Sequence, residues 1–264
     1  MATLLLIAAL LQQPPTDAEA DAALKILKDE LAARGIDGRV AAIKEALKTP
    51  HEKVIKATLE PLAKDADPIR LGACKDLAEV DHPASAEVLV AAIPANLNRP
   101  EVMNAISAAL GALGWQTAAP ALNDLVKRVG EAEVRLILPG VVRALGEIGS
   151  LTSVEVLADF LVRVQGPQRN PWPNEGPIVK AAETALRAIS GVDHKRGIDW
   201  LEWWKNRQAE ISARVKKTYW SRKTHERTTI SAGEKTPEDS ILVAARLTDA
   251  PAAGAAEHRR KKKK

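Results

Sequence analysis

Apolar residues recur along this chain in sets of four, at successive spacings of four, four and three positions. An α-helix turns once every 3.6 residues, so this spacing places all four side chains on one stripe of a helix. A lysine interrupts the first set. The sets, called quartets below, are Ile36, Val40, Lys44 and Leu47; Ile69, Ala73, Leu77 and Val80; Val102, Ile106, Leu110 and Leu113; Ile137, Val141, Leu145 and Ile148; and Ile178, Ala182, Leu186 and Ile189.

The quartets end at residues 47, 80, 113, 148 and 189, with spacings of 33, 33, 35 and 41. A period in this range is typical of stacked repeat units, each of which buries its apolar face against its neighbours. A second helix is expected after each of the last four quartets. Its apolar anchors lie nine residues further on, at Leu89, Leu122, Leu157 and Ile198.

Polar and proline residues mark the expected helix boundaries. Asp67 is the predicted N-cap of a helix whose first residue is Pro68. Pro100 and Pro177 are likewise expected at helix starts. Gly114, Gly149 and Gly191 follow quartets and predict helix ends. With 46% hydrophobic and only 3% aromatic residues, the 264-residue chain favours helices over strands.

The formal net charge of +4 is unevenly distributed. Residues 1–213 carry 24 Lys/Arg against 28 Asp/Glu, whereas residues 214–227 and 257–264 each carry six basic residues and one acidic residue. The repeat region is therefore mildly acidic, which argues against a nucleic-acid groove along it.

Cysteine and histidine give no sign of a metal or catalytic centre. Cys74 is the only cysteine and falls within the second quartet helix, where a small buried apolar residue is expected. The histidines are too far apart in sequence to form a metal-binding motif, and no phosphate-binding glycine loop or nucleophile elbow occurs. We expect no catalytic residue, no metal and no cofactor.

The N-terminal run Leu4 to Leu11 is apolar and is followed by Gln12-Gln13-Pro14-Pro15. We interpret residues 1–20 as a signal peptide and linker, with Ala18-Glu19-Ala20 as a candidate cleavage site, and expect a periplasmic or secreted protein. The alternative is a capping helix of a cytoplasmic protein. The run is too short to span a membrane.

Several segments carry a family resemblance. Ala108-Ala109-Leu110-Gly111, Arg143 through Gly149 and Asp67-Pro68-Ile69-Arg70 resemble HEAT repeats of the short bacterial type, across residues 36–213. The resemblance implies an all-α, right-handed superhelix of about five helical pairs over residues 21–214, with one helix of each pair lining a concave face that holds partners. Only Arg70 keeps the family's arginine after the first apolar anchor.

Tryptophans distinguish two further segments. Trp200, Trp203 and Trp204 share one broad arc of a helix expected from about Ile198 to Arg214, and we interpret them as a structural cap. The loop from Gln165 to Pro177 is rich in proline and accounts for the longest quartet spacing. Within it, Arg169, Asn170 and Trp172 have the composition of an interaction hot spot and are the candidate partner-binding residues.

Residues 215–264 read as a disordered basic tail. Its cationic residues would bind nucleic acid, an anionic membrane surface or another acidic polymer. They are Lys216, Lys217, Arg222, Lys223, Arg259, Arg260, Lys261, Lys262, Lys263 and Lys264.

The sequence therefore predicts a non-enzymatic scaffold that binds an unidentified protein or peptide in the concave face of a HEAT-like solenoid. The alternative is a binder of nucleic acid or anionic surfaces that acts through the basic tail. A third and weaker alternative is an enzyme of the DNA glycosylase or bilin lyase type, since HEAT-like folds include both.

Overall fold

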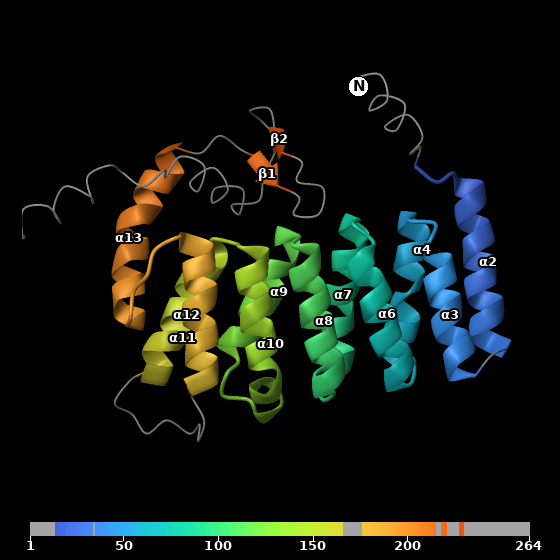
Figure 1. Ribbon diagram of the computed structural model, residues 1–264, viewed down its shortest axis with the longest axis horizontal. Helices are drawn as coiled ribbons and strands as arrows, with labels where there is room; N and C mark the ends of the chain where they lie inside the picture. The colour runs from blue at the N-terminus through green and yellow to red at the C-terminus, as the bar shows by residue number, and fades with distance from the viewer. Residues whose placement is uncertain (1–13, 34, 166–175, 215–217, 221–226, 230–264) are drawn as a thin grey trace, which may run out of the picture. The chain divides into compact units, whose positions relative to one another are not determined.

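The computed structural model describes residues 14–33, 35–165, 176–214, 218–220 and 227–229. The described chain is helical apart from two short strands, and it divides into two compact units, residues 1–113 (unit 1) and 114–264 (unit 2) (Figure 1). An all-helical fold of packed helix pairs is thus what the sequence predicts and what the structure shows.

Unit 1 is built from seven described helices. Quartet helices pack in succession, α3 against α6 and α6 against α8, while α4 and α5 pack against α7 and α2 packs against α3 and α4. The helices are α2 (Asp17–Ala33), α3 (Ile36–Ala46), α4 (Glu52–Ala57), α5 (Leu59–Lys64), α6 (Asp67–Glu79), α7 (Pro83–Asn96) and α8 (Pro100–Leu113).

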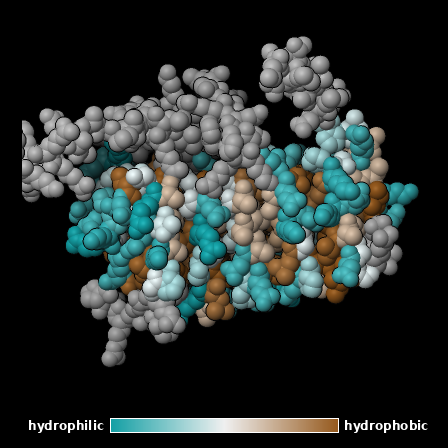
Figure 2. Space-filling view, in the orientation of Figure 1, coloured by the Kyte–Doolittle hydropathy of each residue, from teal (hydrophilic) through white to brown (hydrophobic). Residues whose placement is uncertain are grey.

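Unit 2 repeats this alternation. The quartet helices α10 and α12 pack against each other, α9 packs against α11, and α11 packs against α13 (Figure 1). Figure 2 shows mainly hydrophilic side chains over α13. The elements are η1 (Gln116–Ala118), α9 (Ala119–Lys127), α10 (Ala132–Ile148), α11 (Thr152–Gln165), α12 (Gly176–Ser190), α13 (Gly197–Arg214), β1 (Thr218–Trp220) and β2 (Arg227–Thr229).

The two strands lie in the segment expected to be disordered. β1 and β2 pair antiparallel, with Tyr219 opposite Thr228. These six residues are the described part of that segment. The remainder of residues 215–264 lies outside the described part of the chain.

Most quartet positions lie in the core. The third, fourth and fifth quartets are buried at all four positions, and in the second only Val80 is half-buried. The first quartet, which Lys44 interrupts, is only partly buried: Leu47 is buried and Val40 is half-buried, whereas Ile36 and Lys44 are exposed. Helix α3 also buries Ala42, Ile43 and Ala46. Its apolar stripe is therefore displaced around the helix from the one that the spacing indicated.

The glycine stops are confirmed. Gly114, Gly149 and Gly191 have φ values of 70°, 75° and 77°, in the left-handed region that glycine adopts without a steric penalty. The predicted cap at Asp67 is wrong, because α6 begins at Asp67 itself and Ala66 is the N-cap residue. The Asp67 carboxylate instead forms an ion pair with Arg99.

The anchor expected at Ile198 is also wrong, since this side chain is 44% exposed. Gly197 explains the difference. A Cβ on Gly197 would lie 2.5 Å from the backbone nitrogen of Val162 on α11, so only glycine fits this close approach without a shift of the backbone. With Gly197 against α11, the next side chain turns to solvent and Trp200 takes the buried position.

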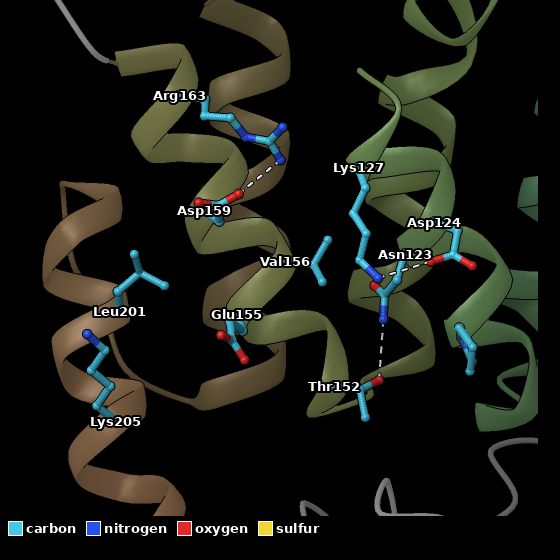
Figure 3. Close-up of a pocket in the computed structure, with 11 residues that line it drawn as sticks. Asn123, Asp124, Lys127, Thr152, Glu155, Val156, Asp159, Arg163, Leu201 and Lys205 are labelled. Atoms are coloured by element: carbon cyan, nitrogen blue, oxygen red, sulfur yellow. Dashed lines mark hydrogen bonds and ion pairs between the residues drawn. The ribbon is translucent and has the colours of Figure 1, made fainter. Parts of the chain in front are cut away.

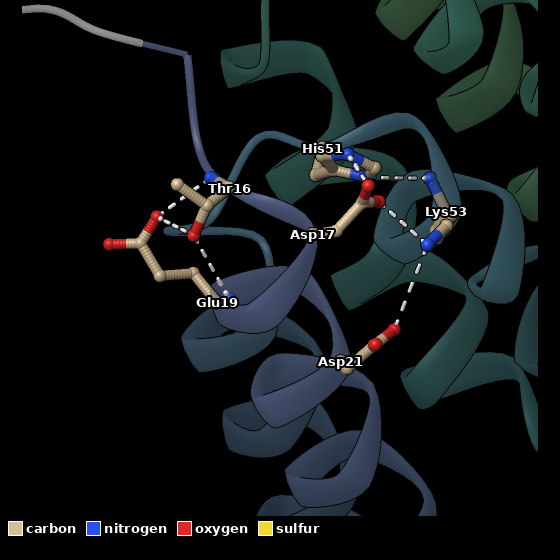
Figure 4. A network of polar contacts seen from close by, with 6 residues as sticks. All are labelled: Thr16, Asp17, Glu19, Asp21, His51 and Lys53. Atoms are coloured by element: carbon tan, nitrogen blue, oxygen red, sulfur yellow. Dashed lines mark hydrogen bonds and ion pairs between the residues drawn. The ribbon is translucent and has the colours of Figure 1, made fainter.

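Helix α2 begins before the expected domain boundary at residue 21. The main-chain N–H of Thr16 donates to Glu19 Oε2 at 2.7 Å, and the Glu19 N–H donates to Thr16 Oγ1 at 3.4 Å, a reciprocal cap (Figure 4). Lys53 on α4 lies 2.6 Å from Asp17, and this hydrogen bond lowers the pKa of the Asp17 carboxyl. Ala20 is fully buried. Residues 16–20 are therefore part of the folded unit.

Helix α6 buries a thiol and a carboxyl group. Cys74 is buried, as expected, and burial raises the pKa of its thiol to about 12. Asp76 is nearly buried, and its Oδ2 has no hydrogen-bond partner among the described residues. Burial is the main cause that raises the pKa of Asp76, and the charge of Lys44 only partly offsets it.

We expect Asp76→Asn to stabilise the protein at neutral pH by about 1 kcal/mol, because it removes a buried negative charge that Lys44 compensates only in part. A carboxyl with a raised pKa in the folded state stabilises the fold below its unfolded pKa and loses this effect as pH rises through the folded pKa. The advantage of the variant should therefore shrink as the pH falls through the raised folded pKa of Asp76 and should be lost below the ordinary carboxyl value of 3.8. Urea unfolding followed by circular dichroism at several pH values measures it. Asp29→Asn, an exposed site on α2, is the control, and an advantage for Asp76→Asn that is independent of pH would contradict the prediction.

Candidate binding groove on helices α9, α11 and α13

An open groove in unit 2 crosses the three helices that follow quartet helices in sequence, α9, α11 and α13. Its volume is about 780 Å³ (Figure 3). The three helices contribute Pro120, Asn123, Asp124 and Lys127 from α9; Thr152, Glu155, Val156, Asp159 and Arg163 from α11; and Leu201 and Lys205 from α13.

Helical periodicity produces the groove. Within each helix the lining residues follow one another at spacings of three or four, with some adjacent pairs, so they form one face. The neighbouring faces of α9 and α11 hold the core residues Leu122, Val126, Leu157 and Leu161. The quartets and their anchors therefore orient the helices, and the polar faces that remain come together because α9, α11 and α13 pack side by side.

Two of the acidic groups in the groove are neutralised by ion pairs within their own helix. Asp124 lies 3.0 Å from Lys127 on α9, and Asp159 lies 3.0 Å from Arg163 on α11. All four side chains are substantially exposed, so these pairs add little stability. Their charges cancel, which leaves Glu155 and Lys205 as the charged lining residues for which no ion pair is formed within the described chain.

Asn123 occupies the floor of the groove and is only 4% exposed. Its Nδ2 donates to Thr152 Oγ1 at 3.3 Å, and Thr152 Oγ1 also lies 2.9 Å from the hydroxyl of Ser150 (Figure 3). These contacts fix the orientation of the amide. Asn123 Oδ1 is buried and has no partner among the described residues.

The groove residues were not identified from the sequence. The only signal is a set of polar positions at helical spacing, which is the pattern of any solvated helix face. Asn123 is a single mid-helix asparagine, so nothing in the sequence separates it from a surface residue. Its role depends on the proximity of α9 and α11, a long-range packing feature.

The partner-binding residues predicted from the sequence, Arg169, Asn170 and Trp172, lie outside the described residues. So do the cationic residues predicted for the tail, namely Lys216, Lys217, Arg222, Lys223, Arg259, Arg260, Lys261, Lys262, Lys263 and Lys264. Both hypotheses stay predictions.

The three clustered tryptophans lie on α13. Trp200 is fully buried, Trp204 is nearly buried and Trp203 is half-buried. The Trp200 ring packs edge-on against His194 at a centroid distance of 4.8 Å and against Trp203 at 6.3 Å. This burial is what the cap interpretation requires of Trp200 and Trp204.

Two of the described histidines cap helices. His51 Nδ1 accepts a hydrogen bond from the backbone N–H of Lys53, and His82 Nδ1 accepts one from that of Ala84. Among the described residues, no group of three or more His, Cys, Asp or Glu side chains is placed to hold a metal ion. None of the described helices is long and apolar enough to cross a membrane.

No protein-family model matches the chain, and no curated protein is significantly similar to it in sequence.

Proposed function

We propose that this chain is a HEAT-like helical-repeat protein that binds other proteins without catalysing a reaction, and that the groove on α9, α11 and α13 holds a segment of the partner. The periodic quartets and the succession of packed helix pairs support the repeat interpretation. In the right-handed superhelix that the resemblance implies, one helix of each pair lines the concave face. We assign this role to α9, α11 and α13.

The observation that carries the proposal is the groove itself. It is open, it crosses α9, α11 and α13, and it combines apolar side chains with charges of both signs. Such a surface suits a polypeptide, which presents apolar and charged side chains together with backbone donors and acceptors. The carboxylates of Asp124 and Asp159 are each paired with a cation, an arrangement that favours binding over acid–base chemistry.

The proposed export requires a cleavage point before Thr16. Cleavage after Ala20 would remove the Thr16 cap, the Asp17–Lys53 ion pair and the buried Ala20 from α2. The loop hot spot and the basic tail are further contacts in this proposal. The basic tail also carries the alternative proposal, a binder of nucleic acid or anionic surfaces.

Selection of a displayed random peptide library against the purified full chain tests this function. We expect peptides that lose at least tenfold in affinity when the groove is filled by Val156→Trp, because the larger ring occupies the space between α9 and α11. Leu136→Trp is the matched control, since Leu136 is 66% exposed on α10 and does not line the groove. Peptides that bind both variants and the wild type equally would contradict the proposal.

A further inference from the structure

The chemistry of the groove specifies what kind of polypeptide segment it suits. Asn123 Oδ1 is a buried acceptor with no partner among the residues that the structure describes, and a buried polar atom in this state destabilises the protein unless a ligand supplies a donor. The Nδ2 group of the same side chain is already committed to Thr152. The amide therefore keeps one unused acceptor, buried on a side chain that lines the groove.

The donor that suits this acceptor is a backbone N–H. Lys127, the cation on the same helix, already donates to Asp124 at 3.0 Å. An extended peptide presents main-chain N–H groups along its whole length, and these need partners when the peptide is buried. A segment that crosses α9 and continues over α11 and α13 can place one of these groups at Asn123.

The two unmatched charges lie on neighbouring helices. Glu155 is on α11 and Lys205 is on α13, and both side chains are exposed (Figure 3). Packed helices lie roughly 8–10 Å apart, and an extended chain advances about 3.3 Å per residue. A segment that crosses from α11 to α13 therefore covers this distance in about three residues.

We infer that the groove binds an extended peptide segment in which a backbone N–H donates to Asn123, a basic residue faces Glu155, and an acidic residue about three positions away faces Lys205. This inference rests on the proposed function and adds the identity of the recognised segment. The bound peptide completes the hydrogen bonding of Asn123 and neutralises both unmatched charges.

Charge exchange tests the pairing with Glu155. The displayed peptide library is selected in parallel against the wild type, Glu155→Lys and the control Glu133→Lys, an exposed site on α10 outside the groove. We expect the wild type and Glu133→Lys to enrich a basic and an acidic residue about three positions apart. Glu155→Lys should bind these peptides about tenfold more weakly and should regain affinity when their basic residue is changed to glutamate.

Backbone methylation tests the contact with Asn123. Synthetic versions of the best wild-type peptide carry one N-methyl group at each position in turn. One position should reduce affinity about tenfold with the wild type and have no effect with Asn123→Leu, which lacks the acceptor. Asn123→Leu should also unfold close to the wild type, because the loss of the Nδ2 hydrogen bond to Thr152 is offset by removal of a buried acceptor that has no partner in the described chain. An asparagine needed only for the fold would instead cause clearly earlier unfolding of the variant.

The outcomes separate the two proposals. One outcome would overturn this inference and leave the proposed function in place. In it, Val156→Trp weakens peptide binding, but the peptides show no charge pattern that responds to Glu155→Lys and no methylated position that responds to Asn123→Leu. The absence of any groove-dependent peptide would overturn both.

Discussion

Replacing Trp200 with alanine should reduce the free energy of unfolding of unit 2 by about 3–5 kcal/mol, the range for removing a fully buried aromatic side chain. The Trp200 ring is completely buried and contacts both His194 and Trp203. It also lies on the helix that contributes Leu201 and Lys205 to the groove. Urea unfolding followed by far-UV circular dichroism measures the loss, and the variant should bind groove-dependent peptides more weakly than the wild type.

The matched control for this prediction is Trp203→Ala. Trp203 is the same residue type on the same helix, but it is only half-buried, so its removal should cost less than half as much. Equal losses in the free energy of unfolding for the two variants would show that burial does not determine what Trp200 and Trp203 contribute to stability. A loss below about 1 kcal/mol for Trp200→Ala would contradict the cap interpretation.

The sequence predicted the helices well because their burial follows a local period. Ile106 and Leu110 on α8 are fully buried, as their four-residue spacing requires. The same logic was wrong at Ile198, because the rotation of α13 is determined by the close approach of Gly197 to the backbone of α11. A glycine shows that such an approach is sterically possible, but the partner helix is known only from the fold.

The groove was less accessible to sequence reasoning than the core. Asn123 and Glu155 are 32 positions apart and lie on helices whose polar faces resemble ordinary solvated surfaces in sequence. The aromatic and basic segments were more conspicuous because their composition is unusual, yet Trp172 and the cationic tail residues lie outside the described chain. Composition thus identified unusual residues, whereas the site depends on which helices are neighbours.

Arg70 shows how one side chain joins several helices of unit 1. It is 4% exposed, and its Nε donates to the main-chain oxygen of Asp65 at 2.6 Å. Its Nη1 donates to Asn96 Oδ1 at 2.5 Å, and Asn96 Nδ2 donates in turn to the main-chain oxygen of Leu62 at 3.1 Å. Asp65 and Asn96 lie at the C-terminal ends of α5 and α7, where main-chain carbonyls lack helical partners and a cation is favourable.

We therefore expect Arg70→Ala to lower the free energy of unfolding by about 3 kcal/mol, since it leaves Asn96 Oδ1 and the Asp65 carbonyl without their donor and creates a cavity. Arg70→Lys should recover little of this loss, because an ammonium group does not reproduce the planar fork that reaches both acceptors. Arg70→Met, which keeps most of the side-chain volume, separates the lost hydrogen bonds from the lost packing.

Arg99→Ala is the control for Arg70→Ala within the same unit. Arg99 is 40% exposed and pairs with Asp67 at the surface, so its removal should cost at most about 1 kcal/mol. Unit 1 contains no tryptophan, so tryptophan fluorescence reports on unit 2 alone, whereas far-UV circular dichroism reports on the helices of both units. A loss of circular dichroism that precedes the change in fluorescence therefore follows unit 1. A loss for Arg70→Ala no larger than that for Arg99→Ala would show that the buried arginine does not hold α5, α6 and α7 together. A larger loss that Arg70→Met shares would assign the effect to its hydrogen bonds.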